Sequence, residues 1–258
     1  MKFEDIVSPE YDLHSEAFMR QSKHILDLEG VLVLKDFITP KAIVSIKEDG
    51  KAGMGAAYFC VSNHNVYLEP FDENFEADHP RNREVVSSKG LIGDDQIPNS
   101  SALKTLYNHD SFRDFISHVV GEDALYPYAD SLSAVNIHYA NEGQELGWHF
   151  DNSTFAVTML IEKPEAGGDF EYVKDMRDAE SNELNFDAVR DLLDGMVETS
   201  VLTINPGSLV LFRGKNSIHR VSPVIGNKTR MMAVLAYNTK PGVQLSESAR
   251  MTFYGRLQ

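Results

Sequence analysis

The chain carries a histidine and an aspartate two residues apart inside an apolar run with the composition of a β-strand. The stretch reads ELGWHFDNSTFAVTML, residues 145 to 160, and the two residues are His149 and Asp151. Residues i and i+2 of a strand point to the same face, so the imidazole and the carboxylate converge on one side. Together they form two adjacent arms of a metal site.

A third ligand is expected from a neighbouring strand. His219 lies 70 residues further on, in NSIHRVSPV, just after the apolar run SLVLFRG. Two histidines and one carboxylate on one face leave three positions open on an octahedral iron, which is the ligand set of non-haem Fe(II) oxygenases. The predicted metal ligands, which are also the predicted catalytic residues, are therefore His149, Asp151 and His219.

An arginine opens the last long apolar run, TRMMAVLAYNT. This residue, Arg230, follows His219 by eleven positions. An arginine buried in a β-barrel is costly unless it is paired. Its planar guanidinium matches a carboxylate group through two parallel hydrogen bonds, so we expect Arg230 to bind a dicarboxylate at the barrel floor.

The elements that must position these side chains are short strands. Eight β-type runs follow residue 130, separated by Gly, Pro, Asn and Asp, and they predict a sandwich or jelly-roll barrel. The runs are residues 131–140, 146–151, 153–162, 168–173, 200–206, 207–214, 217–224 and 229–239. One acidic helix, 182–196, is expected as an excursion between two strands.

The first half of the chain predicts helices and a long polar segment. Helices are expected over 12–29, from Thr39 as N-cap with Pro40 in the first turn, and over 101–123, with a strand over 30–37 between the first two. Residues 60–100 are polar and rich in turn formers, which is typical of a lid or binding loop. We expect an α+β protein with one domain, 1–258, in which a mainly helical part, 1–125, packs on a jelly-roll core, 126–258.

Composition restricts the partners. The formal net charge of −15 disfavours nucleic acid and anionic membranes, because phosphate binding needs clustered Lys and Arg. A single cysteine, Cys60, excludes an internal disulfide and a Cys-rich metal site, which suits a reducing cytoplasm. No signal peptide or membrane-spanning run is visible, so we expect a soluble, cytoplasmic protein.

The ordered set H-x-D, distal His and later Arg, all on β-type runs, resembles the Fe(II)/2-oxoglutarate-dependent oxygenases. The lead-in NIHYANEGQELGWHFD is also similar to that superfamily. More narrowly, DHPRNREVVSSKG, LGWHFDNSTF and FYGRLQ resemble bacterial enzymes that hydroxylate or chlorinate free amino acids, lysine among them. The resemblance implies a double-stranded β-helix that uses Fe(II), 2-oxoglutarate and O2, with Arg230 holding the distal carboxylate of 2-oxoglutarate.

The resemblance also implies roles for residues around the iron motif. One of two arginines in the polar segment, Arg81 or Arg83, would hold the α-carboxylate of the substrate. Asn136, Tyr139 and Thr158 would contact co-substrate or substrate from nearby β-runs. Asn152 flanks the motif on the substrate side, and Tyr254 would close the site. Lysine-handling relatives carry polar or charged residues at the flanks, where this chain has Leu146 and Asn152, so the amino acid stays open.

Asp151 bears on the reaction. Radical halogenases of the resembling group have a small residue in place of the carboxylate, which leaves a position for halide. The aspartate therefore predicts hydroxylation of an unactivated C–H bond in a small substrate that carries a carboxylate and is expected to be a free amino acid. Two alternatives remain: a peptide or protein hydroxylase on the same fold, and a non-catalytic cupin-like metal-binding barrel. Desaturation or ring closure in place of hydroxylation, and the oligomeric state, are not decided by the sequence.

Overall fold

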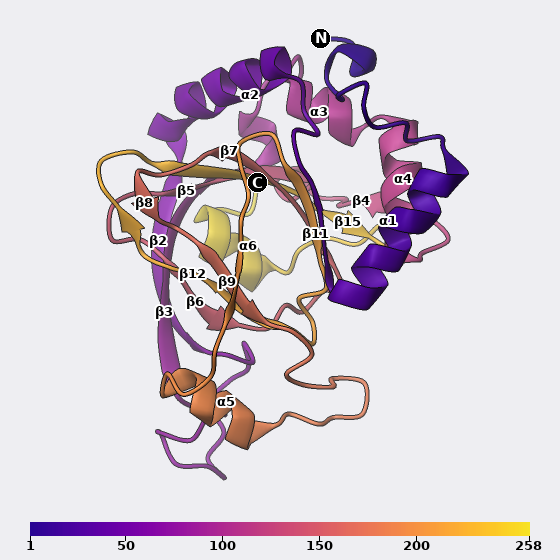
Figure 1. Ribbon diagram of the computed structural model, residues 1–258. Coiled ribbons are helices and arrows are strands. Elements are labelled where there is room, and N and C mark those ends of the chain that lie inside the picture. The colour runs from indigo at the N-terminus through magenta and orange to yellow at the C-terminus, as the bar shows by residue number, and fades with distance from the viewer.

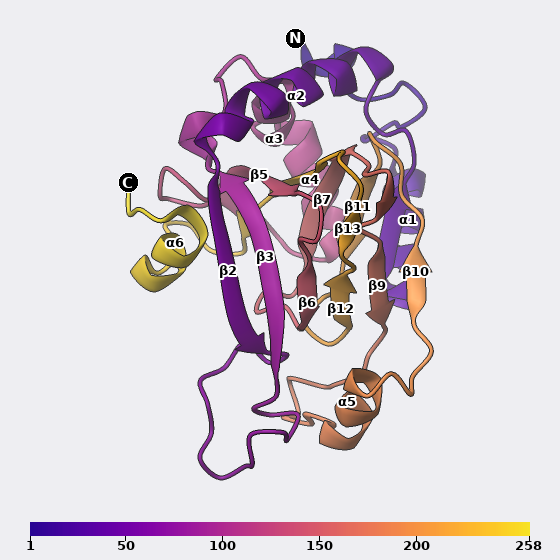
Figure 2. The same ribbon diagram turned by 90° about the vertical axis from the view of Figure 1, so that its left-hand side faces the viewer.

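The computed structural model describes all 258 residues and is built around one large antiparallel sheet that curls on itself (Figures 1 and 2). One half of the sheet, called here the major half, has the order β1-β11-β7-β14-β5-β3-β2, and the minor half has the order β6-β12-β9-β10. Strand β3 joins the halves, because it pairs with β5 through Gly90 and Tyr139 and with β6 through Ser87 and Leu146. This is the jelly-roll arrangement that the sequence predicts.

The strands have the following bounds. In the major half they are β1 (Val31–Leu34), β2 (Tyr58–Asn65), β3 (Glu84–Ile92), β5 (Val135–Ala140), β7 (Ala156–Glu162), β11 (Leu209–Phe212) and β14 (Arg230–Leu235). In the minor half they are β6 (Leu146–His149), β9 (Phe170–Val173), β10 (Ser200–Leu202) and β12 (Ile218–Val221). Two small ribbons complete the set, β8 (Ala166–Gly167) with β13 (Val224–Ile225) and β4 (Tyr126–Pro127) with β15 (Tyr237–Asn238).

Six α-helices surround the sheet. They are α1 (Glu16–Glu29), α2 (Pro40–Gly53), α3 (Ala102–Tyr107), α4 (Asp110–Val120), α5 (Phe186–Leu193) and α6 (Glu247–Tyr254), with short 3-10 turns η1 (Phe3–Asp5), η2 (Met54–Ala56) and η3 (Asp94–Gln96). The predicted cap is confirmed, since Thr39 Oγ1 accepts a hydrogen bond from the amide of Ala42 at 3.3 Å with Pro40 in the first turn. No helix of the chain combines the length and apolar composition needed to cross a bilayer.

All eight predicted β-runs contain a strand of the sheet, and the acidic excursion is α5. The prediction for residues 60–100 is wrong in part, because much of this segment is the hairpin of β2 and β3. The two strands form a long ribbon at one edge of the major half (Figure 2), and most residues of β2 are exposed or only partly buried. Val61 and Val86, for example, are exposed. A strand with little buried face lacks the apolar alternation that marks strands in a sequence.

The two faces of the major half have different surroundings: one packs against helices and the other lines the barrel interior. Alternate residues of β5, β7 and β14 point outward into the main core, where the helices α1 to α4 cover the sheet (Figure 1). This core includes Ile137, Tyr139 and Met231, all buried. The residues between them point into the barrel, which leaves the interior free to carry polar side chains.

A smaller core lies on the outer face of the minor half. Trp148 and Phe150 of the iron-motif segment pack there with Ile218 and with Val189 and Leu192 of α5. Trp148 is thus a packing residue. This core fixes the strand ends that carry the motif, since the side chains between these apolar residues must then face the barrel interior.

A buried carboxylate fastens α2 to the sheet. Glu162, at the end of β7, lies 2.6 Å from the ammonium of Lys47 on α2 and 2.8 Å from that of Lys228. Burial alone would raise the Glu162 pKa, but hydrogen bonds and charge from Lys228 and Lys47 lower it overall. A carboxyl group with a lowered pKa stabilises the fold above the unfolded-state pKa and loses that contribution as pH falls through the folded-state pKa.

We therefore expect Glu162→Gln to lower the free energy of unfolding by about 1–3 kcal/mol at neutral pH. The difference from wild type should shrink as pH falls below 4.5, the ordinary pKa of the group. Urea unfolding at pH 7 and at acid pH measures this. Glu16→Gln is the control, because its pair with Arg20 is exposed and should change stability by no more than about 0.5 kcal/mol. Equal effects of the two variants at pH 7 would contradict the role of Glu162.

Candidate active site

The two motif histidines face each other across neighbouring strands of the minor half. His149, the last residue of β6, is the antiparallel partner of His219 in β12. Their ring centroids lie 4.2 Å apart at an interplanar angle of 51°. Direct cross-strand partners share one face of a sheet, so the pairing register itself brings the two imidazoles together.

Backbone carbonyl groups orient both rings. His149 Nδ1 lies 2.8 Å from the carbonyl oxygen of Gly147, and His219 Nδ1 lies 3.1 Å from that of Ser217. A carbonyl oxygen only accepts, so each Nδ1 carries the proton and each Nε2 presents a lone pair. Burial, followed by the proximity of His219, lowers the pKa of His149 well below its ordinary value, which keeps that ring neutral. This is the state in which imidazole binds a metal.

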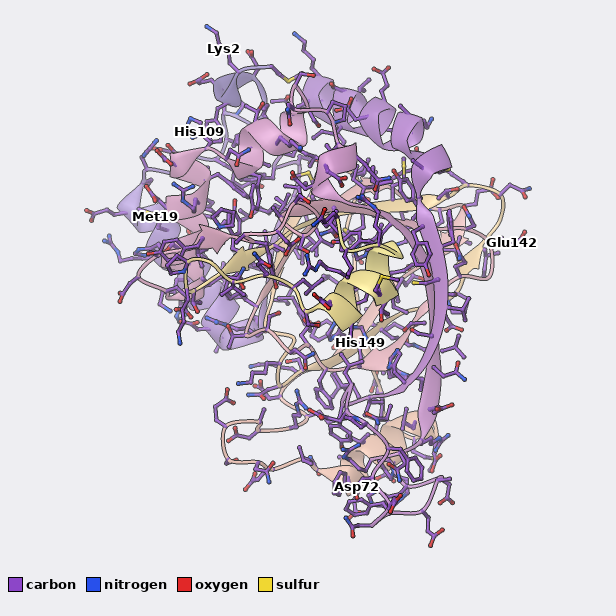
Figure 3. The ribbon with its side chains drawn as sticks, turned by 180° about the vertical axis from the view of Figure 1, so that it is seen from behind. Lys2, Met19, Asp72, His109, Glu142 and His149 are labelled. Atoms are coloured by element: carbon purple, nitrogen blue, oxygen red, sulfur yellow. The ribbon has the colours of Figure 1, made fainter.

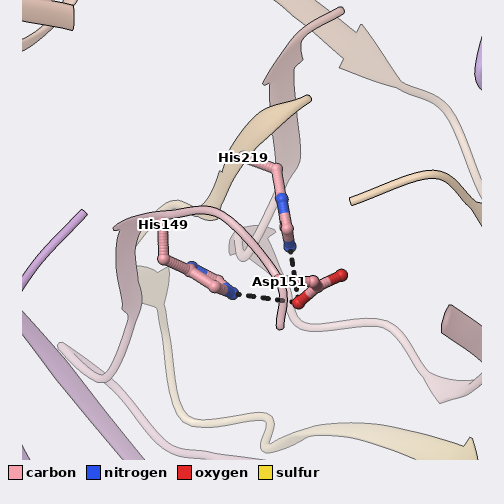
Figure 4. A group of neighbouring side chains, drawn as sticks. All are labelled: His149, Asp151 and His219. Atoms are coloured by element: carbon pink, nitrogen blue, oxygen red, sulfur yellow. Dashed lines mark ion pairs between the residues drawn. The ribbon is translucent and has the colours of Figure 1, made fainter. Parts of the chain in front are cut away.

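Asp151 completes the group from beyond the end of β6. Its amide donates to the carbonyl of Gly214 at 3.0 Å, which holds this segment against the turn before β12. Its Oδ1 lies 3.8 Å from His149 Nε2 and 3.6 Å from His219 Nε2 (Figure 4). The three ligand atoms lie within 4.8 Å of one another, so one ion between them can contact all three.

The donor set fits a divalent transition metal. The second carboxylate oxygen, Asp151 Oδ2, is buried without a hydrogen-bond partner. An unpartnered buried carboxylate oxygen is costly, and a cation at the site would offset that cost. Two imidazole nitrogens and one carboxylate oxygen form the facial set that leaves coordination positions open for small ligands.

Two glycines make room for this geometry. A Cβ on Gly214 would lie 1.9 Å from Asp151 Oδ2, so only glycine allows the carboxylate its position. A Cβ on Gly147 would lie 2.6 Å from the carbonyl oxygen of Val86, so glycine also lets β6 approach β3 closely. Ser87 Oγ accepts from the Gly147 amide at 3.0 Å and lies 2.6 Å from His64 Nε2, which braces β6 behind His149.

The group opens into a cavity between the two halves of the sheet. The cavity encloses about 290 Å³, and most of its lining residues are apolar. Its polar lining includes the three motif residues together with Lys89, His138, Thr158 and Arg230. The volume suits a small organic molecule beside the metal group.

Arg230 lines this cavity, as predicted, and is 6% exposed. Its Nε donates to the carbonyl of Gly168 at 3.1 Å, while its two terminal nitrogens have no protein partner. Burial lowers its pKa to about 10, opposed by the charge of Asp169, so the side chain is a cation at neutral pH. A buried guanidinium with both terminal nitrogens free is ready for a bidentate carboxylate.

The structure separates the three residues predicted around the co-substrate. Thr158 lines the cavity from β7. Asn136 lines a smaller neighbouring cavity and accepts from His138 Nε2 at 2.8 Å. Tyr139 borders the cavity, but it lies three residues from Asn136, so its side chain points to the opposite face of β5 and its predicted contact stays a prediction. Its hydroxyl donates to the Gly50 carbonyl at 2.7 Å, inside the core under α2.

The two arginines of the polar segment do not line the cavity. Arg83 forms an ion pair with Asp194, just past the end of α5, and donates to the Leu193 carbonyl at 3.1 Å. Arg81 donates to the Pro70 carbonyl at 2.9 Å. Figure 3 shows Asp72, in the same loop, beside α5 at the end of the molecule opposite Lys2. No residue of 66–83 lines the cavity, so the loop does not form its wall. A substrate role for Arg81 or Arg83 stays a prediction.

The remaining two predicted substrate residues are also outside the cavity wall. Asn152 is exposed to solvent. Tyr254, on α6, is buried and lines the smaller neighbouring cavity with Asn136. Their proposed contacts stay predictions.

Two cavity residues escaped the sequence analysis as functional candidates. Lys89 lies in the segment expected to be a loop, and His138 lies on β5, outside the iron motif. Burial, together with the charges of Lys89 and Arg230, lowers the pKa of His138 well below its ordinary value. The alternation of side chains along β5 could have placed His138 in the barrel. His138 shares a face of the strand with Ala140, two residues further on, and its neighbour Tyr139 points to the opposite face.

Solved structures share this fold over most of the chain. An oxidoreductase of the 2OG-Fe(II) oxygenase family from Burkholderia pseudomallei is 13% identical, with a TM-score of 0.54, over 89% of this chain and 95% of that one. The carbocyclase SnoK of nogalamycin biosynthesis is 11% identical, with a TM-score of 0.58, over 100% and 96%. The epimerase SnoN, solved with Fe3+, alpha ketoglutarate and nogalamycin RO, is 8% identical, with a TM-score of 0.59, over 86% and 84%.

No curated protein sequence matches this chain significantly. The solved structures confirm the fold expected of Fe(II)/2-oxoglutarate oxygenases. A family model described as Halogenase D matches residues 69–252, a span that contains the metal group, the cavity and Arg230. Since this match covers more than half of the sequence, the chain belongs to the Halogenase D family.

Proposed function

We propose that this protein is an Fe(II)- and 2-oxoglutarate-dependent dioxygenase that hydroxylates an unactivated C–H bond of a small free carboxylic acid, with free amino acids as the substrate class. The observation that carries the proposal is the convergence of His149, Asp151 and His219, with one carboxylate oxygen left without a partner. The Fe3+ and alpha ketoglutarate bound in the SnoN structure support the choice of iron and 2-oxoglutarate.

The three motif residues would hold the iron through the two Nε2 atoms and the Asp151 carboxylate. Bound iron, with 2-oxoglutarate and O2, would supply oxidative chemistry that converts a C–H bond to C–OH and releases succinate and CO2. The protein's own part is to fix the ligands. The carbonyls of Gly147 and Ser217 set the histidine tautomers, and Gly214 leaves room for the carboxylate.

Arg230 would bind the distal carboxylate of 2-oxoglutarate with its two free terminal nitrogens. Thr158 lines the same cavity from the neighbouring strand β7, since Val234 of β14 is its cross-strand partner. Val234 is four residues from Arg230 along β14, so the Thr158 hydroxyl would contact another part of the co-substrate or the substrate. The mainly apolar lining excludes water around the reacting centre, which strengthens these polar contacts.

The aspartate favours hydroxylation over halogenation within a family named for a halogenase. A halide ion needs its own coordination position, and a carboxylate ligand both fills a position and repels an anion. Asp151 Oδ2 also fills the space against Gly214. The enclosed cavity favours a small free substrate over a folded protein, and the buried cation Arg230 favours an oxygenase over a cupin-like barrel without a dicarboxylate ligand.

The first prediction concerns the product. With Fe(II), ascorbate, 2-oxoglutarate and a panel of the twenty proteinogenic L-amino acids, at least one amino acid should gain one oxygen atom, and 2-oxoglutarate should be converted to an equal amount of succinate. Added chloride or bromide should leave the product unchanged. Mass spectrometry of products measures this. A halogenated major product would overturn the hydroxylase assignment, and a product lacking two hydrogen atoms would place the reaction among desaturations or ring closures.

The second prediction concerns Gly214. Gly214→Ala should weaken Fe(II) binding at least tenfold, because the added methyl group displaces the Asp151 carboxylate. Anaerobic Fe(II) titration, or Mn2+ titration followed by electron paramagnetic resonance, measures the affinity. Gly55→Ala is the matched control, because a Cβ there meets no atom within 4 Å. Unchanged metal affinity in Gly214→Ala would contradict the ligand role of Asp151.

The third prediction concerns Arg230. Arg230→Met should weaken 2-oxoglutarate binding about 30-fold or more, because a buried charge partner is lost. Metal affinity should stay within a fewfold of wild type, since Arg230 is not a ligand. Calorimetric titration of 2-oxoglutarate into the Mn2+-loaded protein separates the two effects. An unaltered affinity for 2-oxoglutarate would show that another residue binds the distal carboxylate.

A further inference from the structure

A second cation lines the cavity and has no anionic or hydrogen-bonding partner in the protein. Lys89 lies on β3 and forms neither a hydrogen bond nor an ion pair with any residue of the chain; its ammonium lies 5.3 Å from the centroid of the Phe253 ring. Other lysines with buried stems do have partners. Lys104, for example, lies 3.0 Å from Asp94, and Lys47 lies 2.6 Å from Glu162.

An unpaired ammonium in this position is costly to the fold. Burial lowers the pKa of Lys89 to about 8, although the charges of Cys60 and Asp151 oppose this shift. The amine is therefore still protonated in most molecules at neutral pH. Taking a charge out of water without a partner destabilises a protein, and such groups are retained mainly where a ligand supplies the partner. The missing partner of Lys89 is therefore an anion that enters the cavity.

Lys89 and Arg230 are positioned for different anions. Strand β5 separates them, since it pairs with β3 on one side and with β14 on the other. His138 of β5 lies between the two cations, and both of them lower its pKa. Adjacent strands are about 4.8 Å apart, so the two side chains arise roughly 10 Å from each other. Strand β3 also pairs with β6, the strand that ends at His149, so Lys89 is the cation on the side of the metal group.

Lys89 also marks the boundary between two cavities. It lines the smaller cavity, about 140 Å³, whose other walls include Asn136, Phe253 and Tyr254. Helix α6 contributes the two aromatic residues and packs against β2 and β3. A ligand held by Lys89 would therefore lie between the metal group and α6, where a substrate has room and where the distal end of 2-oxoglutarate on Arg230 does not reach.

We infer that Lys89 is a substrate-binding residue that forms an ion pair with a carboxylate of the organic substrate. This inference rests on the proposed function, because it assumes that iron and 2-oxoglutarate occupy the neighbouring positions. It gives the substrate carboxylate a partner inside the cavity, in place of Arg81 and Arg83, whose guanidinium groups are engaged outside it.

The test uses the full chain loaded with Mn2+ and 2-oxoglutarate, and binding is measured by calorimetry and by thermal shift. The probes are the twenty proteinogenic L-amino acids and, for each acid that binds, the matching carboxamide. Lys89→Met removes the charge at similar volume, and Lys89→Arg retains it. Lys41→Met is the control, because Lys41 is exposed on α2, on the far side of the sheet.

Wild type should bind at least one acid and bind its carboxamide about 30-fold or more weakly. Lys89→Met should lose the same factor for the acid and should no longer distinguish acid from amide. Lys89→Arg should restore most of the affinity, and Lys41→Met should match wild type. In the absence of ligands, Lys89→Met should unfold at the same temperature as wild type or a higher one, because a partly buried ammonium without an anionic partner is gone.

Several results would overturn the inference. They are the absence of binding by every acid of the panel, acid binding that survives in Lys89→Met, and a lower unfolding temperature of Lys89→Met, which would indicate a packing role. If Lys89→Met weakens 2-oxoglutarate as much as Arg230→Met does, Lys89 serves the co-substrate instead. If Arg81→Ala or Arg83→Ala alone abolishes acid binding, the carboxylate is held in the polar loop. Failure of wild type to bind Mn2+ or 2-oxoglutarate would instead contradict the proposed function.

Discussion

The antiparallel register of β6 and β12 is the constraint on which the rest of the site depends. It makes His149 and His219 direct partners, so a slip of one residue would turn one imidazole to the outer face of the sheet. Packing on the outer face disfavours that slip. Trp148, Phe150 and Ile218 are buried there under α5, and a shifted register would move apolar side chains out of this core. The metal group is therefore specified by apolar packing on the other side of the same strands.

In this barrel the outer face of the sheet contributes the stability, and the inner face carries the functional groups. The outer face of the major half carries the main core with α1 to α4, which is large and apolar. The inner face carries groups that a stable interior would avoid: Asp151 Oδ2 without a partner, Arg230 with two free nitrogens, and Lys89 with none of its donors used. These groups are tolerated because the core on the far side of the same strands supplies the stability they cost.

Alternation along strands explains both the success and the failures of sequence reasoning. It placed His149 and Asp151 on one face, and strand assignment with spacing brought in His219 and Arg230. The same rule, applied across three residues, puts the side chains of Asn136 and Tyr139 on opposite faces of β5, so a ligand contact shared by both stays a prediction. Lys89 was missed because much of the ribbon of β2 and β3 is exposed to solvent. The sequence of this ribbon therefore lacks the alternation of apolar and polar residues that marks a strand. The engagement of Arg81 and Arg83 with distant backbone and α5 has no local signal at all.

Membership in a family named for a halogenase is compatible with a hydroxylase because the difference is local. Asp151 is held by its backbone, through the Gly214 carbonyl, and its side chain occupies the space that Gly214 leaves open. The backbone contact does not depend on the side chain, so a small residue at position 151 would keep the two histidines in place and free one ligand position with room beside it. The scaffold fixes the imidazoles, the arginine and the cavity, while this single carboxylate decides whether an anion can share the metal. Under the proposed function, the reaction type depends on position 151 and the choice of substrate on the cavity wall, so the two properties can change independently on one fold.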